Sequence, residues 1–290
     1  MVILPAGVAI IGAGLAVSLE TVLRLIDIEK SETALALALH RQNIPCTIYE
    51  SRSNEATEVA SGVVLTPNRL RILDDLVVLS RIKDRCWLAD HRTYKNDEDV
   101  TTRKTLAANE DLYGFKDHRL WRRILLMEMK IMLEERCIDI VYKARFGGII
   151  AEDETGVHFL INGEIKRASM LIGTDGTVST VRKYIDPDIR PEYTGTVGAL
   201  AHIRRDSVRW PYADYEPQFT LQGKPGAFFT MPEDPKAEHN AGRRQGTTAG
   251  PANNEDTKGG VGIDDMSCLF RVGMQKEVDD TLSNQRSSAS

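Results

Sequence analysis

The segment that most constrains the fold lies near the start of the chain. Residues 8–11 (Val-Ala-Ile-Ile) form an unbroken apolar run that leads into Gly12-Ala13-Gly14. A strand that is buried on both faces of a parallel sheet needs such a run. Glycines directly after it let the main chain approach a pyrophosphate, because no side chain stands in the way. The pattern therefore predicts a buried strand followed by a nucleotide-binding turn.

A second strand follows a helix. Residues 34–42 are rich in Ala and Leu, which favour a helix, and Asn43-Ile44-Pro45 ends it. Residues 46–50 then predict a strand that ends in an acid. The β-α-β order builds a parallel sheet, and an acid at this place bonds the adenosine ribose hydroxyls. The residues that we expect to bind a nucleotide here are Gly12, Gly14 and Glu50.

The connection between these strands is too long for the usual motif. Val17 stands where a third glycine belongs, and the acid follows Gly12 by roughly 15 residues more than this geometry requires. A continuous helix over 15–42 would be about 40 Å long, whereas a neighbouring strand spans about 17–20 Å. We therefore expect an insertion at about residues 17–32 that bulges out or breaks the helix. A translated, unspliced intron is one hypothesis for its origin.

The remaining pattern predicts an α/β domain followed by a β-rich segment. We expect helices at 67–82 and 118–136, strands at 138–143, 157–161 and 165–173, and a hairpin turn at Gly163-Glu164. The predicted domains are 1–190, which binds the nucleotide, and 191–232, which begins a second domain. Residues 233–290 are poor in apolar side chains, and we expect them to be mostly disordered.

Composition excludes several classes of protein. A net charge of -5 gives no reason to expect nucleic-acid or membrane-surface binding. The four cysteines are scattered without a CxxC pair, so we expect neither a metal site nor disulfides, and a reducing, cytoplasmic compartment. Glycines and prolines interrupt the apolar N-terminus, and no basic segment precedes it, so we expect neither a signal peptide nor a membrane anchor.

Four segments together carry a family resemblance. They are residues 8–14, residues 36–50 with Arg52, residues 61–68 (Ser-Gly-Val-Val-Leu-Thr-Pro-Asn), and residues 171–176 (Leu-Ile-Gly-Thr-Asp-Gly) with Ser179, Val181 and Arg182. The chain resembles the N-terminal part of FAD-dependent monooxygenases of the para-hydroxybenzoate and salicylate hydroxylase type. Thr174 stands where that family usually has Ala in its Asp-Gly fingerprint.

The resemblance implies a Rossmann-like FAD-binding domain with a parallel sheet and the beginning of a substrate domain. It also implies an NAD(P)H-using enzyme that hydroxylates an aromatic or related small molecule through a flavin hydroperoxide. Arg119, at the head of the predicted helix 118–136, resembles the family's basic contact to FAD, although Arg122 and Arg123 are alternatives. The cofactor-binding residues implied are Gly12, Gly14, Glu50, Arg52, Gly62, Arg119, Asp175 and Gly176.

No catalytic side chain can be named from the sequence, because the cofactor carries this chemistry. His202 and His239 stay unassigned. The family's second FAD motif begins with Gly-Asp, and this dipeptide does not occur in the chain. We therefore also expect a truncated chain and keep two alternatives: a catalytically inactive FAD-binding remnant, and a flavin reductase or dehydrogenase on the same fold.

Overall fold

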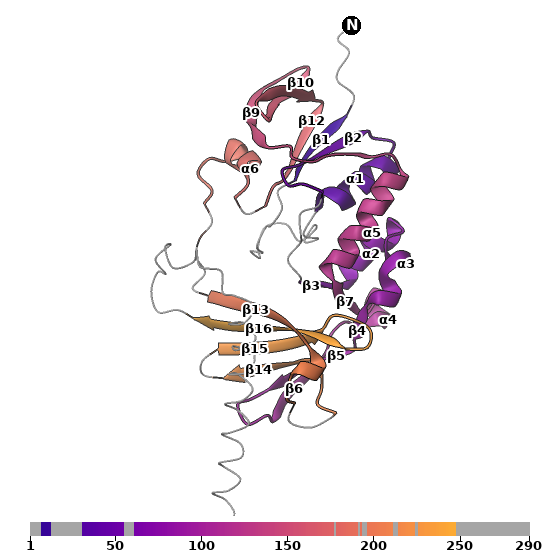
Figure 1. Cartoon of the computed structure of the whole chain (residues 1–290), viewed down its shortest axis with the longest axis vertical. Coiled ribbons are helices and arrows are strands. Elements are labelled where there is room, and N and C mark those ends of the chain that lie inside the picture. The colour runs from indigo at the N-terminus through magenta and orange to yellow at the C-terminus, as the bar shows by residue number, and fades with distance from the viewer. Residues whose placement is uncertain are drawn as a thin grey trace, which may run out of the picture. The chain divides into compact units, whose positions relative to one another are not determined.

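The computed structural model describes residues 7–12, 31–54, 61–176, 178–190, 192, 196–210, 214–223 and 226–247. Its contacts divide the chain into two compact units (Figure 1). The first unit comprises residues 1–59, 68–82 and 123–192, and the second comprises 60–67, 83–122 and 193–290. This division differs from a single boundary near residue 190, because strands between residues 62 and 121 pair within the second unit.

A four-stranded parallel sheet forms the centre of the first unit. Its order is β12-β1-β2-β8, with β1 at Val8–Gly12, β2 at Cys46–Glu50, β8 at Asp139–Val141 and β12 at Met170–Thr174. All five residues of β1 are buried. The apolar run predicts this, because a central parallel strand is covered on both faces. The expected strands at 8–11 and 46–50 are confirmed.

Four helices of the described residues accompany this sheet. They are α1 (Ser31–Arg41), α2 (Pro67–Asp75), α3 (Leu79–Ile82) and α5 (Arg122–Glu135). Helix α1 contacts β1 and β2, and the Thr33 hydroxyl donates to the Met129 sulfur of α5 at 3.6 Å. Helix α1 ends as expected: Asn43 adopts a φ of 58°, and the N–H of Ile44 donates to the Leu39 carbonyl at 3.0 Å.

An antiparallel sheet and a short helix complete the first unit. The sheet has the order β11-β10-β9, with β9 at Phe146–Asp153, β10 at Gly156–Ile161 and β11 at Glu164–Ala168. Helix α6 spans Thr180–Ile185. Ala9 and Ile11 of β1 share a core with Phe159 of β10 and Val181 of α6. This core joins the two sheets of the unit.

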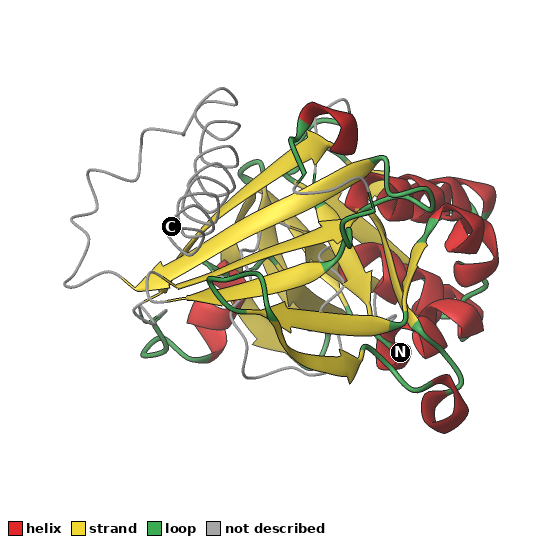
Figure 2. Ribbon diagram, turned by 90° about the horizontal axis from the view of Figure 1, so that it is seen from below, coloured by secondary structure: helices red, strands yellow, loops and turns green. Residues whose placement is uncertain are grey.

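The second unit is β-rich. Strands are drawn in yellow in Figure 2. The six-stranded sheet of this unit has the order β13-β16-β15-β14-β5-β6, and its three-stranded sheet has the order β3-β7-β4. The strands are β3 (Gly62–Leu65), β4 (Trp87–Ala89), β5 (His91–Lys95), β6 (Thr101–Leu106), β7 (Asp117–Trp121), β13 (Thr196–Arg204), β14 (Phe219–Gly223), β15 (Gly226–Pro232) and β16 (His239–Thr247). The short helices are η1 (Lys83–Arg85), α4 (Glu110–Tyr113) and η2 (Arg205–Ser207).

Two predicted helices are wrong in part. The expected helix over 118–136 begins only at Arg122, because residues 117–121 form β7, which pairs with β3 and β4. The expected helix over 67–82 is broken between α2 and α3, where Val77 has a φ of 64°. That turn buries Val78 completely, so burial of an apolar side chain favours the break.

Two other local expectations change. The predicted strand 165–173 is two strands in different sheets, and Ser169 between them donates its N–H to the Gly7 carbonyl at 3.0 Å. The hairpin turn lies at Asn162 and Gly163, which have φ values of 53° and 83°. Residues 239–247, within the segment expected to be mostly disordered, form β16 because they pair with β13 and β15 on either side.

Candidate nucleotide-binding edge

Three predicted segments end at the same edge of the parallel sheet. Gly12 of β1 is in register with Glu50 of β2 on one side and with Thr174 of β12 on the other. We call this edge, formed by Gly12, Glu50 and Thr174 with the following Asp175, the carboxyl edge. Ligands of open parallel sheets bind at the carboxyl ends of the strands. The structure therefore brings together residues that lie up to 163 positions apart.

Glu50 is held in place by the chain that follows it. Its side chain is buried, and its Oε1 accepts hydrogen bonds from the N–H of Arg52 at 3.0 Å and the hydroxyl of Ser51 at 3.3 Å. The Nε of Arg52 lies 3.7 Å from the same oxygen. Among the described residues, these contacts all go to Oε1. Within the described ranges, no such contact goes to the second oxygen of Glu50.

Asp175 and its glycine neighbours organise helix α6. The Asp175 carboxylate accepts from the N–H groups of Thr180 at 2.6 Å and Val181 at 3.3 Å, and from the Ser179 hydroxyl. Gly176 has a φ of 77°, a conformation that favours glycine. Asp175 therefore accepts hydrogen bonds from the N–H groups at the start of α6. This local geometry accounts for the spacing between the Asp-Gly turn and the Ser-x-Val-Arg segment.

Gly173 of β12 is a residue that the sequence reasoning did not single out. A Cβ on Gly173 would lie 2.6 Å from the Val181 Cβ of α6. Such a distance does not occur between real side chains, so only glycine lets α6 pack this closely on β12. The signal was present in the sequence, because Gly173 precedes the Asp-Gly turn within the fourth matching segment.

Helix α1 brings a carboxylate to the carboxyl edge. Glu32 lies in the first turn of α1 and is 5% exposed. A Cβ built on Gly12 would lie 3.6 Å from the Cγ, Cδ and Oε1 atoms of Glu32. The side chain of Glu32 therefore covers Gly12 at ordinary contact distance. The insertion was expected to extend to about residue 32, and its last two residues in fact form the start of α1.

Two other predicted cofactor residues lie in the second unit. Arg119 is on strand β7 instead of at a helix start, and its Nη2 donates to the Glu233 Oε1 at 3.3 Å. A Cβ on Gly62 would lie 2.2 Å from the same oxygen and 2.6 Å from Nη2. Burial lowers the pKa of Arg119, and the charge and hydrogen bond of Glu233 oppose that shift. Gly62 thus makes room for a buried ion pair.

A histidine completes this buried cluster. Glu233 is fully buried, and its Oε2 lies 2.8 Å from the Nδ1 of His202. The indole ring of Trp121 lies next to the His202 ring, with 5.3 Å between their centroids. Among the described residues, the Nε2 of His202 is buried without a hydrogen-bond partner. Sequence reasoning left His202 unassigned and missed Glu233, because no local pattern joins strands β7, β13 and the end of β15.

His239, also unassigned from the sequence, belongs to a turn. It forms a group with Asp234 and Glu238 in which one ligand atom from each lies within 4.8 Å of the others. However, the Asp234 carboxylate accepts from the N–H groups of Glu238 and His239, both at 2.9 Å. These bonds close the connection between β15 and β16, which gives the group a structural role.

The remaining predicted residue and the largest part of the insertion cannot be placed. Gly14 and residues 17–30 lie outside the described residues. The candidate edge is therefore built from Gly12, Glu50 and Asp175 of the predicted set, with Arg52 beside Glu50 and Gly176 beside Asp175. Gly62 and Arg119 belong to the second unit.

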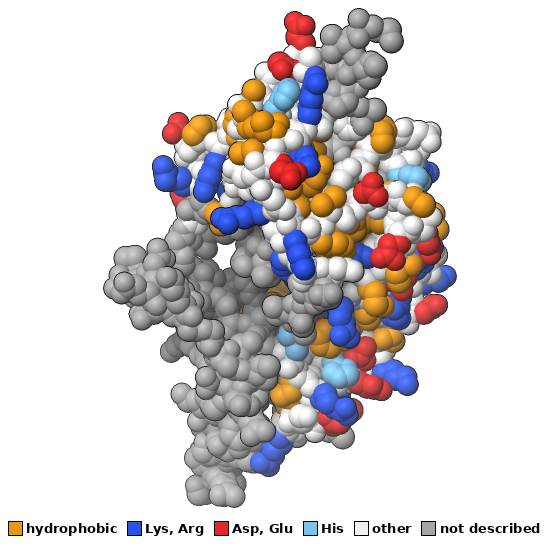
Figure 3. All heavy atoms as spheres, turned by 45° about the horizontal axis from the view of Figure 1, so that its top comes forward, with side chains coloured by type: hydrophobic (Ala, Val, Ile, Leu, Met, Phe, Trp, Pro, Cys, Tyr) orange, Lys and Arg blue, Asp and Glu red, His pale blue; other side chains and the backbone are white. Residues whose placement is uncertain are grey.

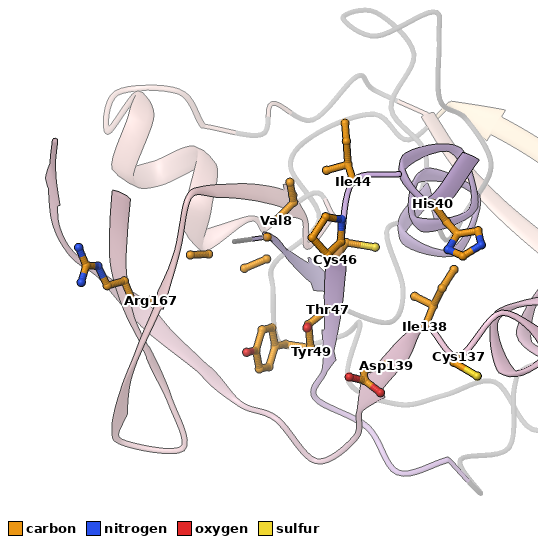
Figure 4. Close-up of a pocket in the computed structure, with 14 residues that line it drawn as sticks. Val8, His40, Ile44, Cys46, Thr47, Tyr49, Cys137, Ile138, Asp139 and Arg167 are labelled. Carbon is orange, nitrogen blue, oxygen red and sulfur yellow. The ribbon is translucent and has the colours of Figure 1, made fainter. Parts of the chain in front are cut away.

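A cavity of ≈ 330 Å³ lies at the opposite edge of the same sheet. Its lining includes Val8, Cys46 and Asp139, which begin β1, β2 and β8, together with His40, Cys137 and Arg167 (Figure 4). Nucleotides bind at the carboxyl ends of parallel strands. This cavity at the amino ends is therefore distinct from the candidate nucleotide edge.

The described surface carries charges of both signs. On the face drawn in Figure 3, basic and acidic side chains alternate with exposed apolar ones. Among the helices of the described ranges, none has the length and apolarity needed to cross a membrane.

No protein-family model matches the chain. The fold is similar to that of CtdE, solved in complex with FAD and a substrate, with a TM-score of 0.69 at 13% identity over 85% of this chain and 58% of CtdE. The sheet and its edge thus define an α/β fold shared with an FAD-binding protein.

Two curated relatives are similar in sequence. A FAD-dependent monooxygenase of Gibberella moniliformis is 28% identical over 216 residues, which cover 68% of this chain and 44% of the relative. Hispidin-3-hydroxylase of Neonothopanus nambi is 26% identical over 195 residues, which cover 63% of this chain and 44% of the relative. The resemblance to FAD-dependent monooxygenases is therefore confirmed, and the chain spans less than half the length of these relatives.

Proposed function

We propose that the carboxyl edge of the first unit binds the adenosine diphosphate part of FAD, in an FAD-dependent monooxygenase. The observation that carries the proposal is the register of Gly12 with both Glu50 and Thr174. It joins the three motifs of the sequence at the edge where this fold class binds ligands. The two monooxygenase relatives support the same reaction class.

The residues at this edge fit the adenosine side of the ligand. Glu50 is buried and held by Arg52 and Ser51, and its second oxygen would accept hydrogen bonds from the ribose hydroxyls. Gly12 offers main chain without a side chain. Asp175 and Gly173 would act indirectly, by fixing α6 against β12. The diphosphate side fits less well, because Glu32 covers Gly12.

When bound, FAD would supply the oxygen-activating redox chemistry of the reaction. In our proposal NAD(P)H is the electron donor, and the product is a hydroxylated aromatic or related small molecule, as the name of the hispidin-3-hydroxylase suggests for that relative. The protein would bind and orient these groups. Cys46, Cys86 and Cys137 form no disulfide within the described residues, which supports our proposal of a reducing compartment such as the cytoplasm.

A second candidate function is a remnant that binds FAD only weakly and has no catalytic activity. The position of Glu32 favours it, because a carboxylate beside Gly12 opposes the negatively charged diphosphate. Both candidates derive from an FAD-dependent monooxygenase, and they differ in whether this chain catalyses the reaction.

Reconstitution with FAD tests the proposal. Purified protein is incubated with FAD, freed of excess cofactor and examined for the visible absorption of bound flavin. NADPH and NADH consumption is then measured with and without a panel of phenolic substrates. Bound flavin and substrate-dependent consumption with a hydroxylated product support the monooxygenase, and bound flavin without turnover supports the remnant. Failure of the 290-residue chain to bind FAD or ADP would refute both.

A further inference from the structure

Glu32 occupies a distinctive place for an acidic side chain. It lies in the first turn of an eleven-residue helix, is 5% exposed, and its Oε1 is 3.6 Å from the position of a Cβ on Gly12. Gly12 is the last residue of the central strand β1 and is flanked by Glu50 and Thr174. The carboxylate therefore lies between the end of the strand and the start of the crossover helix.

In this fold class, the same place receives the diphosphate of a dinucleotide. The N–H groups at a helix start and the positive end of the helix dipole attract an anion there. A glycine at the end of the strand allows the anion to approach the main chain. The carboxylate of Glu32 occupies this place: it lies at the helix start and next to the glycine that ends the strand. A ligand diphosphate would have to displace this carboxylate or lie beside it, and like charges repel.

We propose that Glu32 is an affinity determinant that disfavours diphosphate-bearing ligands at the carboxyl edge. This inference rests on the proposed FAD site and specifies which part of the ligand is opposed. Adenosine, which lacks the diphosphate, does not meet the Glu32 charge. ADP and FAD bring their diphosphate next to the Glu32 carboxylate. Glu50, on the neighbouring strand, acts on the adenosine part and has the opposite effect.

The charge of Glu32 also has a structural effect that the experiment must separate. An acid in the first turn of a helix stabilises that helix through the dipole. Neutralising Glu32 should therefore lower the stability of the protein slightly. If it also tightens ADP binding, the two effects have opposite signs. A general loosening of the edge would not produce this combination.

The test measures adenosine, ADP and FAD binding to the 290-residue chain by titration calorimetry. Glu32→Gln keeps the shape of the side chain and removes the charge. We expect it to tighten ADP and FAD binding by roughly tenfold or more, which corresponds to about 1.4 kcal/mol, and to leave adenosine binding unchanged. Glu50→Gln should weaken the binding of all three ligands.

A matched control separates position from net charge. Glu135→Gln makes the same change of charge at the last residue of α5, where Glu135 pairs with Arg81. The chain then enters β8 at the amino edge of the sheet. We expect ADP affinity in this variant to equal that of the wild type. An equal gain in Glu135→Gln and Glu32→Gln would overturn the inference.

The outcomes also distinguish the inference from the proposed function. If wild type and Glu32→Gln bind ADP and FAD with the same affinity, the inference is wrong and the FAD site stands. If Glu32→Gln tightens adenosine as much as ADP, the effect is not one of diphosphate charge and the inference is again wrong. If no variant binds ADP or FAD, the proposed function fails, and the inference fails with it.

Discussion

Gly62 provides the sharpest test of the geometry in the second unit. Replacing it by alanine adds one methyl group to strand β3. That methyl would lie 2.2 Å from the Glu233 Oε1, 2.6 Å from the Arg119 Nη2 and 2.9 Å from the Arg119 Cζ. Favourable contacts between heavy atoms lie at about 3.5–4.0 Å. The substitution therefore forces the ion pair or the strand to move by roughly 1 Å.

The surroundings leave little room for such a shift. Glu233 is fully buried and Arg119 is 7% exposed, so neither side chain can turn into solvent. Adding a methyl group to a packed interior costs about 1–3 kcal/mol, and separating a buried ion pair costs about 3–5 kcal/mol. Because part of the strain will relax, we expect Gly62→Ala to destabilise the protein by about 2–4 kcal/mol.

Urea unfolding followed by circular dichroism measures this loss, with the change in midpoint converted through the slope. Gly12→Ala is a matched control, because its methyl would meet Glu32 only at 3.6 Å, an ordinary contact. We expect the control to change stability by less than about 1 kcal/mol. Equal stability of Gly62→Ala and wild type would refute the steric argument, as would an equal loss in the control.

Three further outcomes are expected. Gly173→Ala should destabilise the first unit by about 1–3 kcal/mol, because its methyl would lie 2.6 Å from the Val181 Cβ; limited proteolysis should then cleave near α6 faster than in wild type. Met129→Ala should cost about 2–5 kcal/mol in urea unfolding, since Met129 is fully buried. Burial raises the pKa of the Cys86 thiol to about 12, so its thiolate forms only at strongly alkaline pH. Iodoacetamide at mildly alkaline pH should therefore label exposed Cys137 and spare Cys86. Mass spectrometry that finds Cys86 labelled first would contradict this.

The parallel sheet could be predicted because its strands carry their own signals. The apolar run before Gly12 and the strand ending in Glu50 are local patterns, and a parallel register follows once a helix connects them. Helix α6 was not predicted, although Gly173 and the Asp-Gly turn that position it are also local features. In each case, a few neighbouring residues determine both the element and its place at the edge.

The strand β7 shows where local pattern fails. The apolar stripe of the predicted helix begins at Ile124 and Leu125, and periodicity does not mark where the helix starts, so the prediction places the start too early. The structure ends the strand at Trp121 because residues 117–121 pair with β3 and β4 on both sides. Pairing with distant strands overrides a local preference. This changes the position of Arg119 from an exposed helix start to a buried strand.

Burial of Arg119 in turn requires a partner that no local pattern supplies. Arg119 and Glu233 are 114 positions apart, and Glu233 follows a strand whose pairing could not be read from the sequence. A fully buried carboxylate is costly unless it is paired and hydrogen-bonded. Glu233 meets this condition with Arg119 on one oxygen and His202 on the other. The glycine at position 62 then follows as a consequence, because only a residue without a side chain leaves space for this pair beside β3.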